Sequence, residues 1–313
     1  MPERNTMKKI QELQQVKGDA YDYYIAGNED TDLFEKIFLV DDIVEEICKP
    51  DKYFLIGEKG SGKTAYSVYM SKSDKINSFC SISLVENTLY QRFLNMKRQK
   101  ALELSSFKDV WINLIYLILA EKIRKEYGET FFSSIKYKQL SKAIDVFYSD
   151  AFKPEFVNAF EFVDNASASI NSMMKQGLFS TGTKASAETS QKYVEQSFQI
   201  SLLKIRDGFE KAFMSVNLKK PTILFVDGID ARPRDIDNEQ YFECLVGLVN
   251  AVLEMNQSFL KEKQIKIMLL IRPDIMYKMP VHNMNQKLRN NSVLLNWVTS
   301  YRKYIDSKLF KIA

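Results

Sequence analysis

Histidine and cysteine are scarce in this sequence, and both scarcities exclude kinds of site. His282 is the only histidine, so imidazole-rich metal sites and most histidine-based acid–base pairs are excluded. The three cysteines, Cys48, Cys80 and Cys244, lie far apart and form no CxxC pair. This spacing argues against a disulfide framework or a zinc site and suits a reducing compartment.

Long hydrophobic runs are also missing. The most hydrophobic stretch, Val110–Ala120, is interrupted by Asn113 and is too short to cross a bilayer, so it predicts a buried helix. The N-terminus is charged and has no apolar core, so it does not resemble a signal peptide. We therefore expect a cytoplasmic protein with no membrane partner.

A strong excess of one charge is absent as well. The chain has 44 basic and 40 acidic residues, and its formal net charge is only +4. This balance gives no support for nucleic acid as a partner. The hydrophobic fraction of 45% and the charged fraction of 27% are typical of a globular protein rather than a disordered one.

Apolar segments alternate with helical patterns and predict the fold class. We expect an α/β fold, a doubly wound parallel sheet, with a large helical insertion. The predicted parts are a helical N-terminal segment (1–50), the first part of the core (51–90), the insertion (91–217) and the second part of the core (218–313). The expected strands are Lys52–Ile56, Phe79–Leu84, Thr222–Val226, Ile265–Ile271 and Val293–Trp297.

The insertion is predicted to be mainly helical. Phe107–Tyr127 and Phe198–Val216 have apolar residues at helical spacing. Between them, residues 165–189 are rich in Ser, Ala, Gly and Thr, which is typical of a flexible loop.

One glycine-rich segment carries the clearest chemistry. The string GEKGSGKT fits the pattern GxxxxGK[ST], with a hydrophobic strand before it and a helix after it. Its glycines allow backbone N–H groups to approach phosphate oxygens, and the helix N-terminus favours the same anion. We expect Lys63 to reach the β- and γ-phosphates of ATP and the Thr64 hydroxyl to bind Mg²⁺. The predicted nucleotide-binding residues are Gly57, Glu58, Lys59, Gly60, Ser61, Gly62, Lys63 and Thr64.

An acidic residue at the end of a later strand completes the predicted metal site. The segment TILFVDGID is apolar until Asp227, which would emerge beside the phosphates from a strand neighbouring that of the loop. A strand ending in Asp is weak evidence alone, but together with the loop it predicts an Mg²⁺ ligand pair of Thr64 and Asp227.

Two further residues are candidates for catalysis together with Lys63. Asp230 could orient or deprotonate an attacking water, or it could cap a helix or a turn. Arg272 follows the strand Ile265–Ile271 and could sense the γ-phosphate, or it could be an ordinary exposed strand end. Nothing in the sequence selects an arginine finger among Arg232, Arg234, Arg289 and Arg302.

Taken in order, GEKGSGKT, ILFVDGID and LLIRP resemble AAA+-related P-loop ATPases of the STAND and KAP type, in particular bacterial defence-associated ones. The resemblance covers residues 50–85 and 220–300. It implies an Mg²⁺ aspartate (Asp227), a second acid (Asp230) and a sensor arginine (Arg272). It also implies ATP-dependent assembly of a homo-oligomer with a separate effector protein.

Other functions remain open. The short basic stretches 97–100 and 219–220 would suit a DNA-associated loader or maintenance ATPase. A small-molecule kinase also fits the loop. A GTPase normally has an NKxD motif after a later strand, and the nearest string, Ser71–Asp74, directly follows the loop helix; the ABC signature LSGGQ is absent too.

Overall fold

The computed structural model describes residues 17–25, 28–85, 107–132, 137–151, 202–230, 238–279 and 288–297. Within them, five short strands form one parallel sheet in the order β2-β3-β4-β1-β5. The strands are β1 (Phe54–Gly57), β2 (Phe79–Leu84), β3 (Thr222–Asp227), β4 (Ile265–Ile271) and β5 (Ser292–Leu295). β3 and β4 are apolar almost throughout and fully buried, as expected for a parallel sheet covered on both faces.

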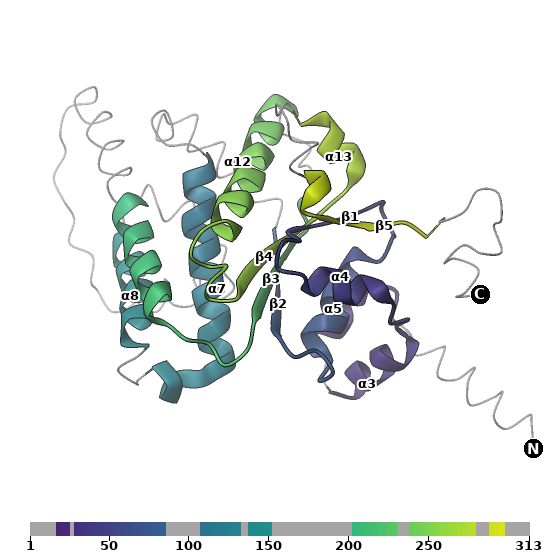
Figure 1. The fold of residues 1–313 in the computed structure, drawn as a ribbon, viewed down its shortest axis with the longest axis horizontal. Helices are drawn as coiled ribbons and strands as arrows, with labels where there is room; N and C mark the ends of the chain where they lie inside the picture. The colour runs from purple at the N-terminus through teal and green to yellow at the C-terminus, as the bar shows by residue number, and fades with distance from the viewer. Residues whose placement is uncertain are drawn as a thin grey trace, which may run out of the picture.

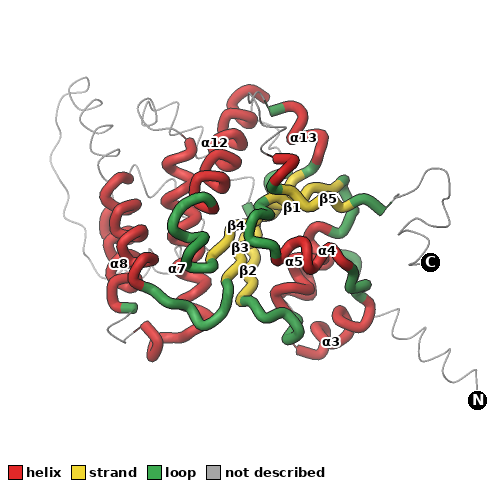
Figure 2. Tube along the Cα trace, viewed as in Figure 1, coloured by secondary structure: helices red, strands yellow, loops and turns green. Residues whose placement is uncertain are grey.

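Helices cover both faces of the sheet (Figures 1 and 2). On one face a buried cluster joins the strands to the N-terminal helices, which are α2 (Ala20–Ile25), α3 (Asn28–Ile37), α4 (Asp42–Cys48) and α5 (Lys63–Lys72). The cluster on the other face contains residues of α7 (Phe107–Phe132), α8 (Lys138–Ala151), α12 (Asn238–Asn256), α13 (Pro273–Lys278) and the helical residues 202–215. Apolar neighbours along β1, β3 and β4 enter the two clusters alternately. The structure therefore has a five-stranded parallel sheet with helices on both faces, which is compatible with the predicted α/β class.

The two faces receive connections that run in opposite directions. From β1 the chain crosses one face through α5 and reaches β2 at the far edge of the sheet. The described helices of the later connections lie on the other face and lead back across the sheet toward β5. The chain therefore leaves the carboxyl ends of the neighbouring strands β1 and β4 toward opposite faces of the sheet. In open α/β sheets, ligands bind at the carboxyl ends of two strands that diverge in this way.

The described part of the helical region shares its core with the sheet. Val110–Ala120 is buried apart from the half-buried Ile118, as expected from the sequence, and α7 is bent at Gly128, where φ is +74°. The indole nitrogen of Trp111 donates to the carbonyl of Cys244 at 3.1 Å, which ties α7 to α12. No helix in the described ranges is both long enough and apolar enough to cross a membrane.

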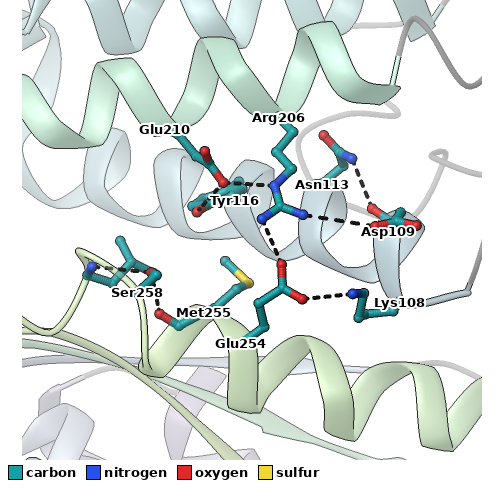
Figure 3. Close-up of polar contacts among 10 residues, drawn as sticks. Lys108, Asp109, Asn113, Tyr116, Arg206, Glu210, Glu254, Met255 and Ser258 are labelled. Atoms are coloured by element: carbon teal, nitrogen blue, oxygen red, sulfur yellow. Dashed lines mark hydrogen bonds and ion pairs between the residues drawn. The ribbon is translucent and has the colours of Figure 1, made fainter.

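A polar network joins three helices on this side of the sheet (Figure 3). Arg206 donates to Glu210 at 2.8 Å and to Glu254 of α12 at 2.7 Å, and Glu254 also pairs with Lys108 of α7 at 2.8 Å. Burial alone would lower the pKa of Arg206, but the two carboxylate partners outweigh it and raise the pKa. Because Glu254 accepts from both sides, it links α12 to α7 and to residues 202–215.

Several predicted bounds are shifted by a few residues, and one strand position was wrong. The strand Phe79–Leu84 is confirmed as predicted, whereas the first and last strands begin and end elsewhere. We expected Asp227 on a strand neighbouring that of the loop, but β4 lies between β1 and β3. Adjacent placement was wrong because α5 crosses to the far edge and leaves room for β3 and β4. The predicted loop 165–189 lies outside the described residues.

Candidate functional site

The loop that follows β1 depends on two glycines. Gly62 has φ of +89°, a left-handed conformation that favours glycine, and it precedes the first residue of α5. A Cβ atom at Gly57 would lie 2.3 Å from the Ser61 hydroxyl oxygen and 2.9 Å from the Leu295 Cβ. The loop therefore folds tightly back on the end of β1 and leads directly into the helix.

The N-terminus of α5 has no side-chain cap. The first N–H groups of a helix have no intrahelical partner, and those of α5 lie at the end of the loop. The Ser61 hydroxyl is buried and has no hydrogen-bond partner among the described residues. An anion placed at this end of α5 would meet unsatisfied donors and the positive end of the helix dipole.

Lys63 is almost completely buried beneath the loop. Its ammonium group donates to the carbonyls of Gly57 at 2.9 Å and Glu58 at 3.2 Å. Burial lowers the pKa of Lys63, while the nearby carboxylates of Asp230 and Asp227 oppose that change. The ammonium group is thus held at the centre of the loop by contacts that an anionic ligand could replace.

Thr64 and Asp227 meet across the site although 163 positions separate them in the chain. The Thr64 hydroxyl donates to Oδ2 of Asp227 at 2.6 Å, and the Gly228 N–H donates to Oδ1 at 2.7 Å. Donating its proton leaves the lone pairs of the Thr64 oxygen free, and each carboxylate oxygen keeps a further lone pair. This hydroxyl–carboxylate pair supplies the hard oxygen ligands that Mg²⁺ prefers.

Two oxygen ligands would not hold a metal ion alone. Within the described ranges, no group of three or more His, Cys, Asp or Glu side chains is placed to bind one. Mg²⁺ usually keeps several waters and binds through one or two carboxylates together with substrate phosphates. The residues at this site fit a metal that arrives with a phosphorylated ligand.

Asp230 lies on the other side of Lys63. Its Oδ2 is 3.9 Å from the Lys63 ammonium nitrogen, and its buried Oδ1 has no hydrogen-bond partner among the described residues. Burial raises the pKa of Asp230 to about 6, although the charge of Lys63 opposes this shift. The residues that directly follow Asp230, where it would cap a helix or a turn, lie outside the described part of the chain.

Arg272 follows β4 and therefore lies between the ends of β1 and β3. Its guanidinium group makes two hydrogen bonds, both of 2.9 Å, to the carboxylate of Asp274. It still lies close enough to Lys63 and Asp230 to influence the pKa of both. The structure thus brings Lys63, Asp230 and Arg272 to one edge of the sheet, with Arg272 held by Asp274.

The remaining predicted residues lie on the outer side of the loop or outside the described part of the chain. The side chains of Glu58 and Lys59 are exposed. Gly60 has φ of +79°, and nothing lies within 4 Å of the position a Cβ would take there. Of the candidate arginine fingers, only Arg289 belongs to the described residues, where it is exposed.

Sequence reasoning missed Trp297. Its indole nitrogen donates to the Ser61 carbonyl at 2.9 Å, and its ring lies 3.9 Å from the position of a Cβ on Gly62. The sequence predicted Trp297 only as the last residue of a strand. In the structure β5 ends at Leu295, and Trp297 contacts the loop instead. An aromatic residue two positions after a strand that pairs with β1 was the one available signal.

Comparisons of this chain with family models, with curated proteins and with solved structures find no match.

Proposed function

We propose that this protein binds ATP with Mg²⁺ at the carboxyl edge of the sheet and hydrolyses it, as a P-loop ATPase. The observation that carries the proposal is the 2.6 Å hydrogen bond between Thr64 and Asp227. The loop and the strand-end aspartate come from distant parts of the sequence. Their meeting at one point supports the interpretation that they are halves of one metal site.

Each residue then has a role that its position supports. Lys63 would donate to the β- and γ-phosphate oxygens instead of to the loop carbonyls. Thr64 and Asp227 would hold Mg²⁺, which neutralises charge on the phosphates when it is bound with the nucleotide. The α5 N-terminus would bind phosphate oxygens through its uncapped N–H groups.

Asp230 is the best placed general base in this proposal. Its buried Oδ1 has an open lone pair, and a pKa raised to about 6 makes its carboxylate a better proton acceptor than an ordinary aspartate. It would orient the attacking water and take up a proton from it. Arg272 would reach the γ-phosphate only after leaving Asp274, so it is proposed as a sensor that changes partner.

The biological role is proposed from the resemblance alone. We propose a cytoplasmic, homo-oligomeric switch whose assembly depends on the bound nucleotide and which acts with a separate effector in bacterial defence. ATP-bound and product-bound loops would stabilise different conformations, as in other nucleotide switches.

The test measures nucleotide binding and phosphate release by the wild type, Lys63→Ala and Asp230→Asn. Removing a charge-assisted phosphate contact should raise the Kd of Lys63→Ala about 10- to 150-fold. Asp230→Asn should bind ATP and lose turnover, because it keeps the shape of the side chain but cannot accept a proton.

Lys36→Ala removes an exposed lysine from α3 and serves as the matched control. If Lys63→Ala binds ATP as the wild type does, the proposed site is wrong. If phosphate passes to added small-molecule acceptors rather than to water, the protein is a kinase. An equal loss of binding and turnover in Asp230→Asn would assign Asp230 a structural role.

A further inference from the structure

A second hollow lies along the β2 edge of the sheet, away from the candidate ATP site. It has a volume of about 670 Å³ and includes the first residues of β2, Phe79–Ser81. The candidate ATP site, in contrast, lies where the strands end. Helix α5 reaches both places, since it begins at the loop with Lys63 and enters the groove with its last residue, Lys72.

Basic side chains from three separate parts of the chain line this groove. It contains five lysines and only two acidic residues, Asp74 and Glu126. The lysines are Lys72 of α5, Lys122 and Lys125 of α7, and Lys219 and Lys220 before β3. A net charge of +4 for the whole chain hides this concentration, because the lysines come together only in the fold. A hollow lined mainly by one sign of charge focuses the field and attracts the opposite charge.

Three tyrosines line the groove together with the lysines. Tyr21 and Tyr24 of α2 lie with their ring centroids 5.4 Å apart, and Tyr127 of α7 lines the groove as well. The ammonium nitrogen of Lys72 is 5.7 Å from the centroid of the Tyr24 ring. The Tyr24 hydroxyl accepts from the N–H of Ile82 in β2 at 3.3 Å, so this ring is fixed to the sheet edge.

We propose that this groove binds single-stranded nucleic acid, with lysines on the phosphates and bases stacked on tyrosines. Positively charged grooves with aromatic stacking surfaces are how proteins bind single strands without sequence preference. A duplex would offer its phosphates but no unstacked bases to the tyrosines. An acidic peptide added to the edge of β2 would compete with Tyr24 for the N–H of Ile82, so the structure favours nucleic acid.

This proposal is independent of ATP hydrolysis, and its test uses the full chain without ATP. Fluorescein-labelled oligo(dT) and oligo(rU) of about 15 nucleotides would be titrated by fluorescence anisotropy. Binding is measured from about 50 to 200 mM salt, because the slope of log K against log salt counts phosphate contacts. The two oligonucleotides distinguish DNA from RNA as the source of the strand.

The charge variant is Lys219→Gln with Lys220→Gln, both exposed residues. Losing two phosphate contacts should make the salt slope shallower by about 1.4, since each contact on a single strand contributes about 0.7. The matched control, Lys261→Gln with Lys278→Gln, removes the same charge from exposed positions outside the groove and should keep the wild-type slope.

The stacking variant is Tyr21→Leu, which keeps an apolar side chain at this position. It should weaken binding by about 5- to 100-fold at constant salt slope. Thermal unfolding of each variant verifies that it is folded before it is titrated.

Three results would overturn the proposal. The first is no binding of either oligonucleotide at about 50 mM salt. The second is an equal loss in the groove variant and in the matched control, which would show diffuse attraction only. The third is displacement of the oligonucleotide by polyglutamate at equal charge concentration together with no effect of Tyr21→Leu, which would point to an acidic protein partner.

Discussion

Burial shifts the pKa of both side chains that face each other beneath the loop, Lys63 and Asp230. Burial favours the neutral form of each side chain. It lowers the pKa of Lys63 and raises the pKa of Asp230. The 3.9 Å between their charged groups is too long for a hydrogen bond. The pair is therefore open to a ligand that supplies stronger partners for both.

This arrangement predicts how pH affects the stability of the nucleotide-free protein. The pKa of Asp230 is raised to about 6, so the stabilisation due to its protonated form is complete below pH 4 and is lost as pH rises through 6. The free energy of unfolding of the wild type, relative to Asp230→Asn, should fall by about 1–2 kcal/mol over that range. This value is discounted because the side chain is 27% exposed.

Urea unfolding of the two proteins at several pH values measures the difference. A relative stability that instead rises with pH would contradict this account, because it would mean that Lys63 stabilises the ionised carboxylate more than burial destabilises it.

At this scale the sequence predicted the loop and the pairing of Thr64 with Asp227, because these residue types and their strand and helix context follow from phosphate chemistry. Trp297 could not be predicted. Its contact with Ser61 spans 236 positions and depends on β5 lying beside β1. The partner of Arg272 was also missed, although Asp274 is only two residues away.

At the scale of elements, most helices and strands follow from their own residues. β3 is apolar between Thr222 and Asp227, β4 is apolar apart from Lys266, and α5 begins directly after Gly62. Their order in the sheet does not follow from local patterns, because it depends on which face each helix covers. The ion pairs of Arg206 that join three helices could not be predicted either. Their members come from distant segments, and each charge alone is typical of a solvated helix face.

Two glycines in helices, Gly247 and Gly208, have different surroundings and predict opposite effects of substitution by alanine on stability. A Cβ at Gly247 of α12 would lie 2.6 Å from the Cβ of Phe107 and 3.0 Å from the backbone nitrogen of Lys108, so Gly247→Ala should destabilise the protein by about 1–3 kcal/mol. At Gly208 nothing lies within 4 Å, so Gly208→Ala should stabilise the protein by about 0.5–1 kcal/mol through helix propensity.

Chemical unfolding of both variants measures the two changes. Stabilisation by Gly247→Ala would contradict the close approach of α7 and α12, and destabilisation by Gly208→Ala would contradict the open surroundings of that helix.

At the scale of the whole molecule, the proposed nucleotide-binding residues lie at the carboxyl ends of the strands, and a group of lysines lies along the β2 edge of the sheet. Helix α5 joins these two places within a single rigid element of 10 residues. Composition alone could not separate them, because the net charge is small and the helical region was expected only as an insertion. The fold shows that its described helices form one core with the sheet.

The most direct test of the central claim is the equilibrium binding of ATP with Mg²⁺ and with EDTA. The measurement compares the wild type with Asp227→Asn, and Asp145→Asn on an exposed position of α8 is the control. We predict that Mg²⁺ strengthens binding to the wild type and to the control. Asp227→Asn should keep Mg²⁺-free binding and lose that gain. Equal strengthening by Mg²⁺ in Asp227→Asn, or no binding of ATP to the wild type, would contradict the claim that Thr64 and Asp227 form an Mg²⁺–nucleotide site.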